Sequence, residues 1–226
     1  LGYLPEALVN YLALLGWNPG DSRELFALEE LVAQFDLSRI QKGGAIFNMQ
    51  KLNWFNAEYL KQLTTEEFAR RLIAFLPPSI VVLPQFSVER FNRVAAILQE
   101  RLPTFLEITT LARDGDLTHY FSPPAYERAL LSWKGKQSDA DIKTYLQTVQ
   151  TLMREIPEHS FSSTTVRDTV FPYAEVKGRG DVLWPLRVSL SGREKSPDPF
   201  VLAGILGKSE TLSRLDAALE LVKENQ

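Results

Sequence analysis

The sequence contains no cysteine among its 226 residues. This absence excludes disulfide bonds, a metal site built from thiolates and catalysis by a cysteine nucleophile. Histidine is scarce as well: His119 and His159 are the only two, and neither lies at metal-ligand spacing from a second ligand or beside a serine motif. We therefore expect no catalytic residue and no metal site in this chain, and we interpret both histidines as loop residues.

Long apolar runs are also missing. No stretch approaches the roughly 20 apolar residues that a membrane-spanning helix needs, and the first residues lack the basic segment of a signal peptide. The chain starts in an amphipathic pattern without an initiator methionine, which suggests that it is a piece of something longer. We expect a cytoplasmic protein with no membrane partner.

Cations are not in excess, since 25 Lys and Arg residues stand against 28 Asp and Glu, for a net charge of −3. This balance argues against indiscriminate nucleic-acid binding, which depends on cations that displace counterions from phosphates. One segment is locally basic: from Lys177 to Lys195 there are five basic residues and two acidic ones. From charge alone, a solvated surface is the simplest explanation of that segment.

Helix signals dominate what is present. Pro5 in a first turn and Gly16 as a stop predict a helix over 5–16. Residues that favour capping predict further helix starts at Asn48, Thr64, Ser87, Thr104, Ser122, Ser138 and Ser196. Only 80–83 has a strand-like composition, and we interpret it as a buried connector. The sequence therefore predicts an all-α fold of helical-bundle regions in tandem, divided into 1–64, 65–160 and 161–226.

Phosphate-binding and acid–base motifs are not convincing. The segment 204–209 ends in Gly-Lys-Ser, but its first glycine is too close for a Walker A loop and no strand precedes it. Paired carboxylates such as Glu66 and Glu67 lie in first turns of predicted helices, where they complement the helix dipole. A self-contained enzyme is therefore the weakest of the functional hypotheses.

Two segments carry a resemblance to a known family. The first has Gly-Tyr-Leu-Pro-Glu-Ala-Leu and continues to Gly-Trp over 2–17, followed by Phe47, by Lys-Leu-Asn-Trp-Phe-Asn at 51–56 and by Tyr59. It resembles the stem-contact region of bacterial glutamyl-tRNA synthetases. The second has Pro-Leu-Arg-Val-Ser-Leu-Ser-Gly at 185–192, Ser-Pro at 196–197, Phe200 and Leu-Gly-Lys at 206–208. It resembles the end of the anticodon-binding region in that family.

The resemblance implies a parent enzyme, a class I ligase that joins glutamate to tRNA(Glu) with ATP and magnesium. The family's His-Ile-Gly-His-like motif and Lys-Met-Ser-Lys-Ser-like loop do not occur here. We therefore expect a chain that has no cofactor of its own and cannot charge tRNA alone. The expected partner is tRNA(Glu), with tRNA(Gln) left open, and the expected state is a monomer.

The resemblance also implies contacts with the anticodon. Arg187 is the first choice, because a guanidinium can donate twice to a base edge or stack on a base. A surface salt bridge is its alternative role. Ser196, Pro197, Pro199 and Phe200 lie at the start of the next predicted helix, where free amides can hold acceptors and a ring can stack. Their alternatives are a simple cap for the Ser-Pro pair, a departure from the family's apolar residue for Pro199 and core packing for Phe200.

Two further residues are candidates for tRNA contacts. Arg101 falls at the place of an arginine that reads the last anticodon base in discriminating family members, although a charge at a helix C-terminus explains it equally. Lys51 is expected to contact backbone phosphate near the inside corner of the tRNA. Trp17 and Trp54 are expected in the core, and Asn56 is expected to cap or bridge helices.

A hypothesis of another class stays open. An all-α scaffold for protein interactions could have kept this fold and lost RNA recognition. The near-neutral charge and a middle region, 77–170, that looks shorter than in the family favour it.

Overall fold

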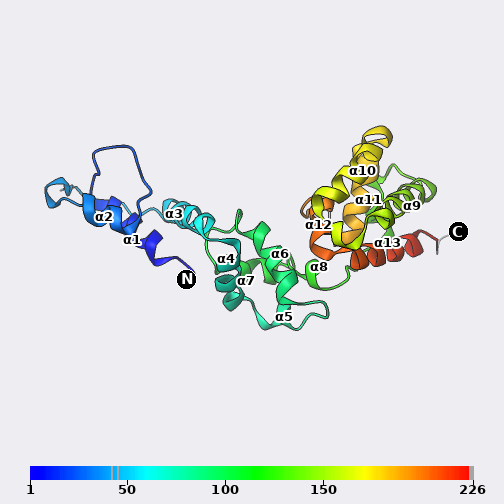
Figure 1. The fold of residues 1–226 in the computed structure, drawn as a ribbon, viewed down its shortest axis with the longest axis horizontal. Coiled ribbons are helices and arrows are strands. Elements are labelled where there is room, and N and C mark those ends of the chain that lie inside the picture. The colour runs from blue at the N-terminus through cyan, green and yellow to red at the C-terminus, as the bar shows by residue number, and fades with distance from the viewer. Residues whose placement is uncertain (42, 45, 224–226) are drawn as a thin grey trace. The chain divides into compact units, whose positions relative to one another are not determined.

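The structure is a computed structural model that describes residues 1–41, 43–44 and 46–223. Its regular structure is helical (Figure 1), and the described residues form no β-strand beyond an isolated bridge between Trp17 and Ile40. The predicted all-α class is confirmed. Within the same described part, no helix has both the length and the apolar character that crossing a membrane requires.

The chain divides into two compact units, Leu1–Pro77 with Phe91–Arg113 and Pro78–Arg90 with Asp114–Gln226. Compactness alone does not decide which regions carry which function. The three functional regions predicted at 1–64, 65–160 and 161–226 therefore stay a prediction.

The first unit starts with α1 (Pro5–Gly16), α2 (Leu28–Gln34), the 3-10 helix η1 (Leu37–Arg39) and α3 (Met49–Gln62). A buried polar pair joins the loop before α2 to α1 and α3: the Asn10 side-chain oxygen accepts from the Phe26 amide at 2.9 Å and from the Tyr59 hydroxyl at 2.6 Å. The expected bridging role of Asn56 is confirmed, because it accepts from the Leu4 amide and donates to the Pro103 carbonyl. The side-chain oxygens of both asparagines are therefore satisfied, whereas the buried side-chain nitrogen of Asn10 has no partner among the described residues.

The rest of the first unit contains α4 (Thr65–Leu72), η2 (Ile73–Phe75), α7 (Glu107–Arg113) and the larger part of α6 (Val88–Leu98). The Thr64 hydroxyl accepts from the Glu67 amide, which confirms the predicted cap. Gln99 is buried and donates to the carbonyls of Leu60 and Leu63 at the end of α3. The Leu60 carbonyl also accepts from the Leu63 amide at 3.2 Å, so Gln99 adds a second donor there and caps the end of α3.

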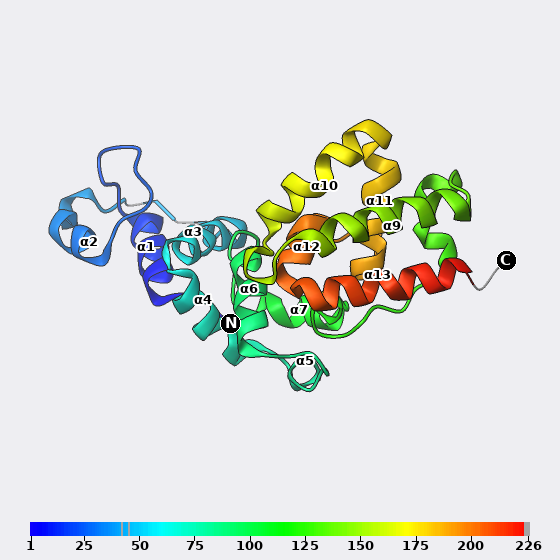
Figure 2. The same cartoon turned by 45° about the vertical axis from the view of Figure 1, so that its right-hand side comes forward.

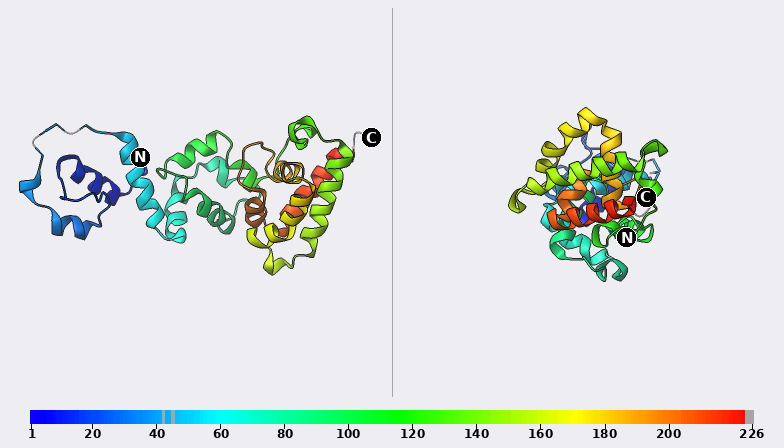
Figure 3. Two further views of the ribbon diagram at one scale, coloured as in Figure 1. Left: turned by 90° about the horizontal axis from the view of Figure 1, so that it is seen from above. Right: turned by 90° about the vertical axis from the view of Figure 1, so that its right-hand side faces the viewer.

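The second unit is a bundle (Figures 2 and 3) with short elements before it: α5 (Pro78–Val81), α8 (Thr118–Phe121), η3 (Arg128–Leu131) and η4 (Trp133–Gly135). The bundle itself consists of α9 (Asp139–Glu155), η5 (Glu158–Ser160), α10 (Ser163–Lys177), α11 (Arg179–Ser191), α12 (Pro199–Leu206) and α13 (Lys208–Lys223). Helix α11 is central, because α9, α10, α12 and α13 all contact it. The predicted Ser138 capping box at the start of α9 is confirmed.

Several local expectations are wrong. In the predicted buried connector only Ile80 is buried, whereas Val81 and Val82 are exposed. Ser122 ends α8 and opens no helix, and the cap of α12 is Asp198 rather than Ser196. His119 is no loop residue: it lies in α8 and is only 5% exposed. The errors at 80–83 and His119 concern burial, which depends on distant parts of the chain, whereas those at Ser122 and Ser196 concern which neighbouring residue begins or ends a helix.

Candidate nucleic-acid interface

Helix α11 carries the first-choice residue, Arg187. The helix starts after Gly178, which has φ +110°, and ends before Gly192, which has φ +66°; both values favour glycine. Most of the inward side chains of α11 are buried, whereas Leu183, Trp184 and Arg187 are half-buried. At about 100° per residue, Arg187 projects between the directions of Leu183 and Trp184, one turn further along.

The guanidinium of Arg187 has no ion-pair or hydrogen-bond partner among the residues that the structure describes. Its neighbours differ: Arg179 pairs with Glu175 at 2.7 Å and Arg193 pairs with Asp116 at 2.5 Å. The alternative role of Arg187 in a surface salt bridge therefore finds no support. Its donors remain available to an outside acceptor.

The segment after α11 is less open than expected. Ser196 and Pro197 are half-buried, and the Ser196 hydroxyl donates to the Pro197 carbonyl at 3.2 Å. The free amides predicted for this helix start are reduced, because proline has no amide hydrogen and the Phe200 amide donates to the Asp198 carboxylate at 2.9 Å. Ser196 and Pro197, the Ser196–Pro197 edge, are half-buried between the exposed Lys195 and Asp198.

The structure places Phe200 in the core, as its alternative role required. Its side chain is 3% exposed and meets Phe171 edge-on at a ring distance of 6.3 Å. Pro199 is buried beside it. In this conformation Phe200 offers no free face on which a base could stack.

Two hollows flank the half-buried strip of α11. The first lies against Leu183 and is lined from α10 and α12 by Ser163, Thr164, Arg167, Phe171, Asp198, Phe200 and Val201. The guanidinium carbons of Arg167 and Arg179 lie 5.5 Å and 4.9 Å from the centre of the Phe171 ring. This hollow is therefore aromatic and cationic at once.

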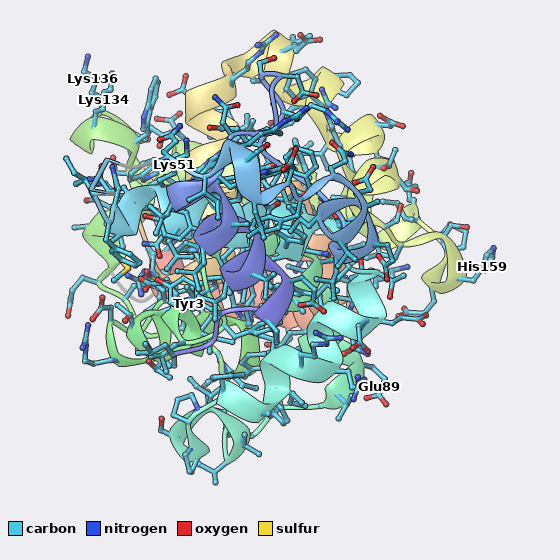
Figure 4. The ribbon with its side chains drawn as sticks, turned by 90° about the vertical axis from the view of Figure 1, so that its left-hand side faces the viewer. Tyr3, Lys51, Glu89, Lys134, Lys136 and His159 are labelled. Atoms are coloured by element: carbon cyan, nitrogen blue, oxygen red, sulfur yellow. The ribbon has the colours of Figure 1, made fainter. Side chains whose placement is uncertain are left out.

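The second hollow, the tryptophan hollow, lies against Trp184 on the other side. Its lining consists of Ala129, Leu130, Ser132, Trp133, Lys134, Gly135, Trp184 and Glu194. Lys134 and Lys136 project outward from the turn that forms its rim (Figure 4). Sequence reasoning missed both hollows. The Ser-Trp-Lys-Gly-Lys run at 132–136, a tryptophan between lysines in a turn, is the signal that could have found the second.

Arg101 and Lys51 belong to the first unit. Arg101 is exposed in the turn after α6, and its side chain has no partner among the described residues. Lys51 is exposed on α3 (Figure 4) and is ion-paired with Glu24. The structure does not gather these two residues with the α11 surface into one unit.

The two tryptophans of the first unit differ in burial. Trp17 is buried, as expected, against Phe26 and Phe35. The expectation for Trp54 is wrong, because it is 42% exposed and lines a shallow hollow with Ser22–Leu25.

A buried histidine of the second unit, His119, lies close to two arginines. Burial, together with the nearby charges of Arg193 and Arg214, lowers the pKa of His119 to about 3. His119 is therefore neutral at physiological pH. In the described part of the chain, no three His, Asp or Glu side chains gather as a metal site would need.

Two family models match the chain. A family model described as "Anticodon binding domain" matches residues 67–219, so the chain belongs to the family of anticodon-binding domains. A second model, the catalytic domain of class I tRNA synthetases (E and Q), matches residues 1–54. The likeness to bacterial glutamyl-tRNA synthetases predicted from the sequence is confirmed by the relatives that follow.

The chain is 34% identical to a glutamate–tRNA ligase of Clostridium novyi over 99% of its own length and 45% of that protein. It is 36% identical to one from an Anaeromyxobacter species, again over 99% of its own length and 45% of the relative. The crystal structure of a glutamate tRNA ligase from Elizabethkingia meningosepticum, in complex with its amino acid, aligns with a TM-score of 0.77 and 31% identity, covering 97% of this chain and 41% of that one. The chain thus spans somewhat under half the length of these relatives.

Proposed function

We propose that this chain is the tRNA-binding part of a glutamate–tRNA ligase. Residues 1–64 contact the acceptor-side stem, and the α11 surface reads the anticodon. The observation that carries this proposal is Arg187: a half-buried arginine with no partner in the described chain, on the central helix of an anticodon-binding domain. An arginine without a partner pays no cost of breaking an ion pair when it meets a base.

The Ser196–Pro197 edge adds to the same surface. It follows α11 closely, and the Arg193–Asp116 ion pair anchors the segment between them. Unpaired bases are recognised on their edges and faces, so a guanidinium next to a fixed backbone segment fits this role. Phe200 contributes by packing against Phe171 and holding the start of α12 in place.

The proposal for the whole enzyme goes beyond this chain. Residues 1–54 match a catalytic-domain model, and the same segment exposes large apolar side chains such as Val32, Leu37 and Ile46. Large apolar side chains exposed to this degree are typical of interaction surfaces. They support a contact with the remainder of the catalytic domain, which would use ATP and magnesium to join glutamate to tRNA(Glu) in the cytoplasm. The chain alone would be a monomer without ligase activity.

Lys51 and Arg101 take positioning and discriminating roles in this proposal. Lys51 would exchange Glu24 for a tRNA phosphate at little cost, because exposed ion pairs contribute about 0–1 kcal/mol. Arg101, exposed in its turn, would read the last anticodon base and decide whether tRNA(Gln) is also accepted.

The test is binding of the 226-residue chain to the anticodon arm of tRNA(Glu) at several salt concentrations. Arg187→Ala should weaken binding by about 1–3 kcal/mol, the range for a base-contacting arginine. Arg154→Ala is the matched control, since Arg154 is an exposed arginine of the same unit on α9. Equal affinity of the Arg187→Ala and parent chains, or no preference for tRNA(Glu), would favour the protein-interaction scaffold instead.

A further inference from the structure

The tryptophan hollow has two fixed aromatic walls. The indole nitrogen of Trp184 donates to the Leu130 carbonyl at 2.8 Å. The Trp133 amide donates to the Gln137 side chain at 2.9 Å, and its ring lies so close to Gly180 that a Cβ there would overlap it. Both rings are therefore held in place before any ligand arrives.

Two charged side chains line the same hollow. The Lys134 ammonium lies 4.7 Å from the centre of the Trp133 ring, and Glu194 enters from the segment after α11. Neither has an ion-pair or hydrogen-bond partner within the described residues. Both charged groups are therefore available to an outside ligand.

The place of the hollow connects it with the anticodon surface. Trp184 lies one turn before Arg187 on α11, and Glu194 lies two residues before Ser196. An RNA strand in contact with both Arg187 and the Ser196–Pro197 edge would therefore pass next to the hollow. Proteins that bind single-stranded nucleic acid combine aromatic platforms for bases with cations for the backbone, and this hollow has both.

We propose that the tryptophan hollow binds one unpaired base of the anticodon loop, next to the base that Arg187 contacts. The base stacks on the indole of Trp133 or Trp184, and Lys134 neutralises its phosphate. A carboxylate can accept a hydrogen bond from an exocyclic amino group, so Glu194 selects cytosine, adenine or guanine over uracil. The proposal rests on the proposed anticodon function and extends its surface to the η4 turn.

The first experiment scans the loop with abasic nucleotides. The anticodon arm of tRNA(Glu) is titrated against the parent chain and Trp133→Leu, with one loop base removed at a time. We expect Trp133→Leu to weaken binding about tenfold, as loss of one stacked base does. One abasic position should lower the affinity of the parent and leave that of Trp133→Leu unchanged, because coupled groups are not additive.

The second experiment tests the aromatic ring and the charge of Lys134 separately, with variants that we expect to keep the fold. Trp133→Phe retains a ring and should bind within about twofold of the parent, since every aromatic face can stack. Lys134→Ala should reduce the slope of log affinity against log salt by about one. Lys223→Ala, which removes an exposed lysine of α13 paired with Glu220, is the control and should leave the slope unchanged.

The outcomes separate the two proposals. If the arm binds in an Arg187-dependent way but no loop position couples to Trp133, the hollow holds no base and this inference alone falls. Coupling to a uracil position overturns the assigned role of Glu194. If the arm does not bind the parent chain, both proposals fall. Coupling at an amino-bearing base, together with the Lys134 effect, supports the inference.

Discussion

The guanidinium of Arg214, only 3% exposed, is paired with the carboxylate of Glu210 at 2.6 Å. Burial works against the charge of Glu210, yet hydrogen bonds from Arg214 and Gln85 hold the pKa of that carboxyl below its ordinary value. Arg214 also donates to three backbone carbonyls, those of His119 at 2.7 Å, Leu190 at 2.5 Å and Ser122 at 3.1 Å. One side chain on α13 therefore holds α8 and the end of α11 together.

Arg214→Met should destabilise the chain by about 3–5 kcal/mol, because it leaves the partly buried Glu210 carboxylate without its cation and three carbonyls without the donor that Arg214 supplies. Arg214→Lys should recover only part of this loss, since an ammonium cannot reproduce the planar fork. Urea unfolding gives the free energies. Arg154→Met is the control: its ion pair with Asp216 is exposed and 3.5 Å long, so less than about 1 kcal/mol should be lost. Equal effects in the two variants would contradict a structural role of Arg214.

His119 predicts a pH dependence of stability. Burial and the charges of Arg193 and Arg214 lower its pKa in the folded chain to about 3, against 6.5 for a free histidine. Below pH 6.5 the unfolded chain therefore binds a proton that the folded chain does not. Stability should fall as the pH falls from about 6.5 towards 3, by about 1.4 kcal/mol per pH unit.

The measurement is the free energy of unfolding in urea at pH 7.5 and pH 5.0 for the parent and for His119→Phe. The parent should lose about 2 kcal/mol between these values, and the variant should lose distinctly less. Glu210 and Asp116 are carboxylates near the arginines that face His119, and Glu210 titrates below its ordinary value, under this pH window. An identical slope in both chains would mean that another group binds the proton.

Local signals in the sequence were sufficient for most of the fold. Asn48 and Ser138 cap their helices through residues three positions away, so their role is visible without knowledge of distant contacts. The surface sites were harder to predict from the sequence. Trp184 is fixed by the Leu130 carbonyl, 54 residues away in sequence, and no pattern of spacing announces that bond. Trp54 and His119 were misplaced for the same reason, and the choice between a stacking role and a core role for Phe200 stayed open, because burial depends on what the rest of the chain brings to the site.

The substitution Gly180→Ala tests the close contact between α11 and the Trp133 ring in the tryptophan hollow. Glycine inside a helix is ordinarily about 0.5–1 kcal/mol less favourable than alanine. Gly180→Ala should nevertheless destabilise the chain, because the new Cβ overlaps the Trp133 ring. Gly16→Ala in α1 is the control, since no atom lies within 4 Å of its added Cβ, and this variant should be as stable as the parent or more so. Thermal unfolding measures the effect of both variants.

The role proposed for Arg101 predicts how strongly the chain prefers tRNA(Glu) to tRNA(Gln), whose anticodons differ in the last base. Arg101→Gln should lower the ratio of affinities for tRNA(Glu) over tRNA(Gln) by about 1–3 kcal/mol, since an arginine that donates to one base edge rejects another. Arg93→Gln, an exposed arginine on α6 in the same unit, should leave the ratio unchanged. Both variants are compared with the parent in competition titrations at one salt concentration, because phosphate contacts would otherwise dominate the difference. A ratio that is near one in the parent would mean that the chain accepts both tRNAs, and a ratio unmoved by Arg101→Gln would assign this arginine to the end of α6 rather than to the anticodon.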